Sequence, residues 1–200
     1  MSNKVKGEDA ILKSFIAIFV VSAIAGMVTP ARSGAAEAQT GKPVTATAAI
    51  EGCTDVGISG MAKLTEEKTE EGVKEVRVTM MVQGLTPGKH AVHIHQTGIC
   101  TPCGAAGGHF DPGPNSNTSP DGNHPFHSGD LINIVANKQG IGTLNTTTTR
   151  VTLSDGPLGL FDADGSAFII HVNPDTYCPA GEAAGCAGGG RAACGIILKD

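Results

Sequence analysis

The chain has few basic residues and no cluster of them. Its 200 residues include 14 lysines and arginines against 19 aspartates and glutamates, which gives a formal net charge of −5. Proteins that bind nucleic acid usually carry a basic patch that neutralises phosphates. An acidic chain without such a patch is a poor nucleic-acid binder, and we expect no nucleic-acid partner.

The apolar run at residues 15–28 is too short for a membrane-spanning helix, which needs ~20 residues. Lys4, Lys6 and Lys13 precede this run, and small residues follow it, including Ala-Glu-Ala at 36–38. This is the layout of a secretory signal peptide. We expect residues 1–38 to be a signal peptide, or an N-terminal anchor if they are not cleaved, and residues 39–200 to form the domain. The domain is then periplasmic or extracellular, and it meets the membrane only if the N-terminal segment stays.

No cysteine lies near the expected cleavage point, which argues against a lipoprotein. An even number of cysteines in an oxidising compartment favours disulfides over a redox or zinc motif. The six cysteines all lie in the exported part: Cys53, Cys100, Cys103, Cys178, Cys186 and Cys194.

No long segment has helical periodicity. Short runs with the composition of β-strands recur instead, separated by glycine, proline and other turn formers. The expected strands cover residues 44–51, 58–64, 73–83, 89–95, 131–136, 150–154, 167–172 and 194–198. This density of strands predicts an all-β sandwich or closed barrel. Two long segments, 96–129 and 173–191, interrupt the pattern, and long loops in a compact domain are usually functional or disordered.

Three of the seven histidines lie between residues 90 and 95. Side chains alternate along a strand, so His93 and His95 share one face and His90 lies on the other with Val92 and Ile94. Two adjacent imidazoles on a stiff strand suit metal binding better than a core. Further candidate ligands follow at His109, His124, His127, Asp130 and His171. An all-imidazole ligand set suits copper, and a mixture of histidine and aspartate suits zinc.

Five motifs between residue 44 and the C-terminus resemble those of copper/zinc superoxide dismutases and follow the same order. They are GKHAVHIH, GGHFDP, HSGDL, FIIHVNPD and GGRAACGII. The resemblance implies an eight-stranded Greek-key β-barrel, flattened like a sandwich, with two long functional loops that hold the metals outside it. It also implies dismutation of superoxide to dioxygen and hydrogen peroxide, with copper and zinc as cofactors.

The resemblance assigns roles to individual residues. His93, His95, His109 and His171 match the copper ligands, and His109 also matches the imidazole that bridges copper and zinc. Arg191 matches the arginine that guides the superoxide anion, so the resemblance implies catalytic roles for Arg191 and His109.

The zinc ligands match less completely. His109, His127 and Asp130 match three of them, and Asp175 matches the carboxylate that joins a copper ligand to a zinc ligand. The family places another zinc histidine well upstream of the last one, and this chain has none there. His124 is the candidate, in a compact H-x-x-H-x-x-D pattern. The alternative is an exposed His124 and a chain that binds copper with a weak or absent zinc site.

The resemblance also implies a disulfide to Cys194. Its partner is Cys100 in the bacterial pattern, which we favour, or Cys103 in the eukaryotic pattern. Cys178 is then expected to pair with Cys186, and Cys53 with Cys103.

Two other functions remain open at this point. An exported copper-binding or copper-delivery domain could keep this fold without turnover, and a structural disulfide-rich β-domain would leave the metal-type residues without a role. Superoxide is the expected substrate, and the chain is expected to be a monomer or a homodimer.

Overall fold

The structure, a computed structural model, describes residues 42–113, 118–181 and 183–200. The expected signal peptide at residues 1–38 lies outside the described residues. Residues 41–200 belong to one compact unit. Within the described ranges, no helix has the length and apolar character needed to cross a membrane.

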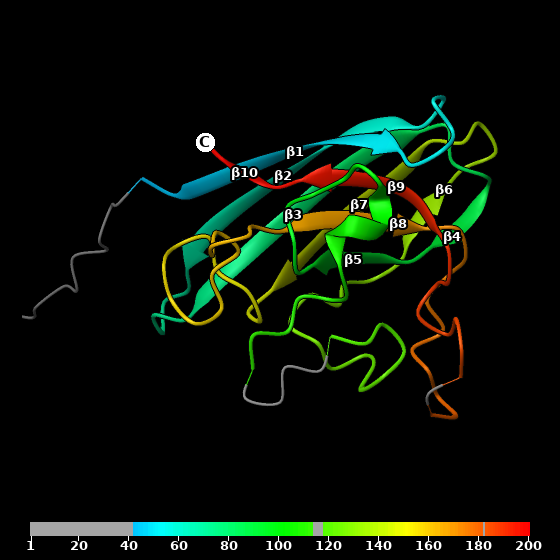
Figure 1. Cartoon of the computed structure of the whole chain (residues 1–200). Helices are drawn as coiled ribbons and strands as arrows, with labels where there is room; N and C mark the ends of the chain where they lie inside the picture. Colours follow the sequence, from blue (N-terminus) through cyan, green and yellow to red (C-terminus); the bar gives the residue numbers. More distant parts are fainter. Residues whose placement is uncertain (1–41, 114–117, 182) are drawn as a thin grey trace, which may run out of the picture. The chain divides into compact units, whose positions relative to one another are not determined.

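The described residues form ten strands and one short 3-10 helix, η1 (Figure 1). The strands are β1 (Val44–Gly52), β2 (Ser59–Lys68), β3 (Lys74–Gln83), β4 (Gly88–His90), β5 (Val92–His95), β6 (Ile134–Ala136), β7 (Gly142–Thr148), β8 (Ala167–His171), β9 (Arg191–Ile196) and β10 (Leu198–Lys199). The helix η1 spans Cys103–Ala106. The all-β prediction is confirmed.

The sheet is antiparallel and runs in the order β4-β6-β7-β3-β2-β1-β9-β8-β5, with β10 beside β1. Its two end strands, β4 and β5, are consecutive in the chain and separated only by Ala91. The N–H of Ala91 donates to the carbonyl of Asn173, and its own carbonyl accepts from the N–H of His171. The chain therefore passes from one end of the sheet to the other at Ala91, which closes the sheet into the expected Greek-key barrel.

One expected strand is wrong. Residues 150–154 form no strand and make one isolated bridge, between Thr152 and Gly159. Val151 and Leu153 do alternate inward and are fully buried, which explains the strand-like pattern. Part of the backbone of this segment bonds to a side chain instead of a neighbouring strand: the buried carboxylate of Glu66 accepts bonds from the N–H groups of Leu153 and Ser154 and from the Ser154 hydroxyl.

The strand that the sequence analysis missed is β7. Only Leu144 is a large apolar residue among its inward positions, so the sequence Gly-Thr-Leu-Asn-Thr-Thr-Thr carries a weak alternation signal. Its place is set by pairing with β3 over seven residue pairs, from Val76 and Thr148 to Val82 and Gly142. Gly142 leaves room there for Leu85 and Ile134, since a Cβ would lie 2.9 and 3.0 Å from their methyl carbons.

Both faces of β5 and β8 are buried. Phe168 and Ile170 of β8 join the main core inside the barrel, whereas Ala167 and Ile169 pack outside it with Ala106 of η1 and four of the cysteines, Cys53, Cys100, Cys103 and Cys194. The long segments after β5 and before β9 extend from the same side of the barrel in Figure 1. These segments turn the outer face of two strands into a second buried layer.

We predict that Glu66→Gln destabilises the domain by about 1.5–3 kcal/mol. The buried bonds to a carboxylate are lost, and the NH2 group of the glutamine would face an N–H or O–H donor instead of an acceptor. Burial raises the pKa of Glu66, but its bonds from Ser154 and Leu153 lower it by more, so the net pKa is below the usual 4.5. The carboxylate therefore stabilises the fold above that pH and loses this effect as the pH falls through the lowered pKa.

Denaturant unfolding of metal-free wild type and variant should show a difference in the free energy of unfolding that is largest at pH 7 and shrinks in acid. A constant difference would contradict the prediction.

Candidate metal centre

Strand β5 directs two imidazoles outward from the barrel. Val92 and Ile94 point into the core, and His93 and His95 occupy the alternate positions. Both histidines are nevertheless 0% exposed, because the loops cover this face. The shared face expected from alternation is therefore present, on the outside of the barrel and away from water.

Backbone bonds at Ile94 bring two distant segments to β5. The N–H of Ile94 donates to the carbonyl of Gly129, and the N–H of Gly129 donates to the carbonyl of Phe110. The N–H of Phe110 donates in turn to the carbonyl of Ile94, and all three bonds are 2.8–2.9 Å long. This closed cycle of three bonds places His109 and Asp130, which adjoin Phe110 and Gly129, beside His95 and His93. Gly129 has no room for a side chain, since a Cβ would lie 2.3 Å from the Ile94 oxygen.

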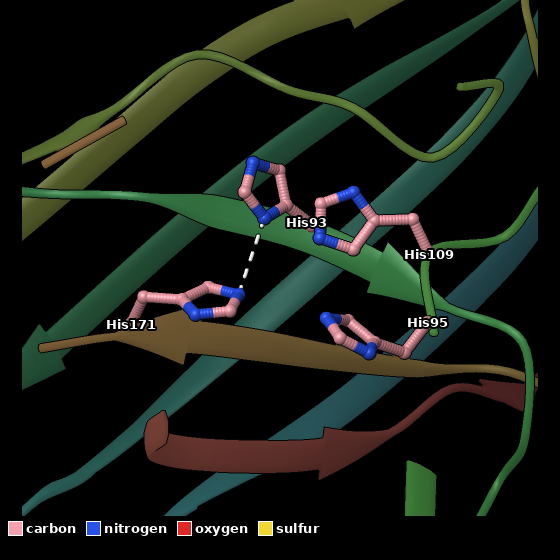
Figure 2. Close-up of side chains that lie close together, drawn as sticks. All are labelled: His93, His95, His109 and His171. Carbon is pink, nitrogen blue, oxygen red and sulfur yellow. Dashed lines mark hydrogen bonds between the residues drawn. The ribbon is translucent and has the colours of Figure 1, made fainter. Parts of the chain in front are cut away.

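Four histidines form the first group that could hold a metal: His93, His95, His109 and His171. Figure 2 shows the four rings converging from β5, β8 and the segment after β5. One ligand nitrogen from each lies within 4.8 Å of the others, and Nδ1 of His93 is 3.2 Å from Nε2 of His171. We call these residues the four-histidine group.

The four-histidine group fits copper. Nε2 of His95 and Nε2 of His109 are buried and have no hydrogen-bond partner among the described residues. A buried nitrogen without a partner costs about 1–3 kcal/mol, unless a metal uses its lone pair. The opposite nitrogens are fixed by carbonyls, with Nδ1 of His95 donating to Gly107 and Nδ1 of His171 to Gly189 at 2.9 Å. An all-imidazole set in which carbonyls orient two of the rings suits copper.

Burial keeps these imidazoles neutral. It lowers the pKa of His93 to about 3 and that of His171 to about 4, and it also lowers the pKa values of His95 and His109. The neutral form is the one that binds metals. Each of the four rings can therefore act as a ligand at neutral pH.

A second group that could hold a metal combines His93, His109, His124 and Asp130. His127 adjoins it, with Nδ1 3.2 Å from Nδ1 of His109 and 3.0 Å from Oδ2 of Asp130. Burial raises the pKa of Asp130, but its bonds with His109, His124 and His127 lower it far more, so the carboxylate stays charged. Imidazoles gathered on a charged carboxylate are a ligand set that suits zinc.

His124 is buried and linked to both groups. Its Nε2 lies 2.7 Å from Oδ2 of Asp175, and its Nδ1 lies 3.1 Å from Oδ2 of Asp130. Burial lowers the pKa of His124, but its bonds with Asp130 and Asp175 raise it to about 9. A metal at Nδ1 would displace a proton from this ring. The exposed position considered for His124 is not the one it occupies, since it is 6% exposed.

Asp175 joins the two groups. Its Oδ2 lies 3.2 Å from Nε2 of His93 as well as close to His124. Asn133 fixes the backbone of Asp175, since its amide donates to the Asp175 carbonyl and its oxygen accepts the Asp175 N–H. Burial raises the pKa of Asp175, but the bonds with His124 and His93 hold it well below the usual range.

Arg191 begins β9, and its guanidinium donates to the carbonyls of Cys103 and Gly107. Gly107 also accepts the Nδ1 bond of His95, so one carbonyl positions both side chains. The charge of Arg191 is near enough to add to the effect of burial in lowering the pKa values of His95 and His171. Arg191 therefore lies beside the four-histidine group.

Three disulfides are present: Cys100–Cys194, Cys53–Cys103 and Cys178–Cys186. Cys100 is thus the partner of Cys194, and Cys103 is not. The first two bridges tie η1 and the residues before it to β9 and to Cys53, the residue that follows β1. A third possible metal group, Asp121 with Cys178 and Cys186, offers no thiolate because its two cysteines form a bridge.

His90 lies apart from both metal groups. Its Nδ1 donates to the carbonyl of His171 at 2.8 Å, and its Nε2 is within 3.2 Å of the Thr86 hydroxyl. Strand alternation predicted His90 on the face opposite His93 and His95. No sequence signal assigned a role to Asn133 or Gly107, which hold Asp175 and Arg191. A carbonyl contact such as that of Gly107 leaves no trace in residue type, because every residue has one.

We predict that Gly129→Ala destabilises the domain by about 1–3 kcal/mol and weakens binding of both metals, because a Cβ cannot coexist with the Ile94 carbonyl. Metal content after dialysis and the unfolding midpoint are the measurements. Gly104→Ala is the matched control, since a Cβ at Gly104 meets nothing within 4 Å. Equal metal retention in the two variants would contradict the prediction.

Comparison with known proteins identifies the family. The model of the copper/zinc superoxide dismutase family matches residues 58–197. A curated relative, "Superoxide dismutase [Cu-Zn]" of Deinococcus radiodurans, is 39% identical, and the alignment covers 60% of this chain and 69% of that protein. The matched range contains both metal groups and Arg191. The chain therefore belongs to the copper/zinc superoxide dismutase family.

Proposed function

We propose that this chain dismutates superoxide outside the cytoplasm at a copper held by the four-histidine group. The observation that carries the proposal is the pair of buried Nε2 atoms of His95 and His109, which have no partner in the described part of the chain and belong to a cluster of neutral imidazoles. Two superoxide ions and two protons give one dioxygen and one hydrogen peroxide. Bound copper supplies the one-electron oxidation and reduction that this needs.

His109 has a role in both metal groups. Its Nε2 belongs to the four-histidine group, and its Nδ1 lies 2.8 Å from Oδ1 of Asp130. We propose that Nε2 of His109 holds one of the two protons that the peroxide takes up. The contacts at Nδ1 keep the ring in place while that proton comes and goes.

Arg191 guides the anion. The carbonyls of Cys103 and Gly107 take one N–H from each terminal nitrogen, so each nitrogen keeps a second N–H for a ligand. A fixed, permanently charged fork suits a small anion. The second long segment has no lysine, so we assign the local steering almost entirely to Arg191.

We propose that His109, His124, His127 and Asp130 hold zinc, with Nδ1 of His124 as the ligand atom. The contact of its Nε2 with Asp175 supports this orientation, because a ligating histidine commonly donates its other nitrogen to a carboxylate. The displaced position of His124 in the sequence is then compensated by the fold of the loop.

The three disulfides favour an oxidising compartment. We propose that the chain is exported by residues 1–38 to the periplasm or the extracellular space and acts there in antioxidant defence as a monomer or homodimer. Superoxide is the substrate, and contact with the membrane arises only if the N-terminal segment is retained.

For the metal assignment, we predict one copper and one zinc per chain after loading with both ions and dialysis. His124→Ala should lose zinc and keep copper, because His124 is outside the four-histidine group. Metal analysis by mass spectrometry checks this, with the copper content of the variant as the internal control. Copper without zinc in the wild type would refute the zinc site, and a copper-loaded chain without turnover would favour a copper-delivery role.

For Arg191, we predict that Arg191→Ala lowers the second-order rate constant by about 10-fold or more and flattens its dependence on ionic strength. Arg77→Ala, on the outer face of β3, is the matched control and should keep the wild-type rate. Pulse radiolysis at several salt concentrations gives both quantities. The same dependence of the rate constant on ionic strength in wild type and Arg191→Ala would contradict the steering role.

A further inference from the structure

Arg150 reaches from the barrel to the segment 124–130, which we call the zinc segment. Its Nη1 donates to the carbonyls of Pro125 at 3.1 Å and His127 at 2.9 Å, and its Nη2 donates to the carbonyl of Asp130. One guanidinium therefore holds three carbonyls of a seven-residue segment. Two of these carbonyls belong to residues that we assign as zinc ligands.

The zinc segment is held from within by short-range bonds. Phe126 donates to the Asn123 carbonyl at 2.9 Å, Asp130 donates to the His127 carbonyl at 3.2 Å, and the N–H of His127 donates to the Asp130 carboxylate at 2.9 Å. Phe126 is 73% exposed and adds little packing. A segment this short must still aim two imidazoles and one carboxylate at a single point.

The backbone of Arg150 is tied to a strand of the barrel. Arg150 follows β7, and its N–H donates to the hydroxyl of Thr148, the last residue of that strand. Strand β7 pairs with β3 along its whole length. The guanidinium thus connects the zinc segment to the barrel through hydrogen bonds.

We propose that Arg150 is a positioning residue for zinc: its three carbonyl bonds hold His124, His127 and Asp130 in the geometry that binds the ion. This inference rests on the zinc assignment proposed above. The planar fork is essential, because a lysine ammonium carries the same charge but cannot span three carbonyls in fixed directions. Mutation of groups that orient metal ligands typically costs about 10- to 100-fold in metal affinity.

The experiment measures zinc affinity in the copper-loaded protein by competition with a chromophoric chelator. Wild type is compared with Arg150→Ala and Arg150→Lys, and Arg77→Ala serves as the control for loss of an exposed arginine on a strand. Cobalt(II) substituted for zinc reports the ligand geometry through its visible absorption bands. Copper content is measured in each sample.

We expect both Arg150 variants to bind zinc about 10- to 100-fold more weakly, with altered cobalt bands and wild-type copper content. Arg77→Ala should match the wild type. Zinc affinity within threefold of wild type in both Arg150 variants, with an unchanged cobalt spectrum, overturns the inference alone. Equal loss in Arg77→Ala also overturns it. If the wild type takes up no zinc, the zinc assignment fails and this inference fails with it.

Discussion

The edge of β5 that does not pair with β8 is the constraint on which the metal centre depends. The backbone groups of Ile94 need partners there, and they find them in Gly129 and Phe110. Because backbone bonds tolerate little variation in distance, satisfying Ile94 also fixes His109 and Asp130 beside the histidines of β5. Backbone bonds at the edge of the barrel therefore position a site that lies outside it.

Asp175 makes the two metal groups interdependent. One carboxylate oxygen lies near Nε2 of both His93 and His124, so the orientation of a four-histidine ligand and that of a proposed zinc ligand are set together. Asn133 fixes the backbone of Asp175, and the N–H of Tyr177 donates to the other carboxylate oxygen. A single charged group therefore orients both rings, as expected where ligating imidazoles share a carboxylate.

The two long segments also hold each other. Asp121, in the first, accepts the N–H groups of Gly185 and Ala187 in the second, at 2.8 and 3.1 Å. The bridges Cys100–Cys194 and Cys53–Cys103 tie the first segment to the barrel near Arg191. Because these loops cover β5 and β8, they exclude water from the imidazoles, which is why burial dominates the pKa values of the four-histidine group.

The sequence by itself determined the features that depend on local periodicity and residue type: an all-β chain, His93 and His95 on one strand face, and a ligand set suited to copper and zinc.

Where local signals were ambiguous, tertiary structure decided which segments form strands. Residues 150–154 alternate like a strand, but Leu153 and Ser154 bond to Glu66, whereas β7 is a strand because β3 pairs with it. Only the folded chain could decide the partner of Cys194, the burial of His124 and the reach of Arg150. These are contacts between segments far apart in the sequence, and their formation depends on how the barrel closes rather than on any pattern within one segment.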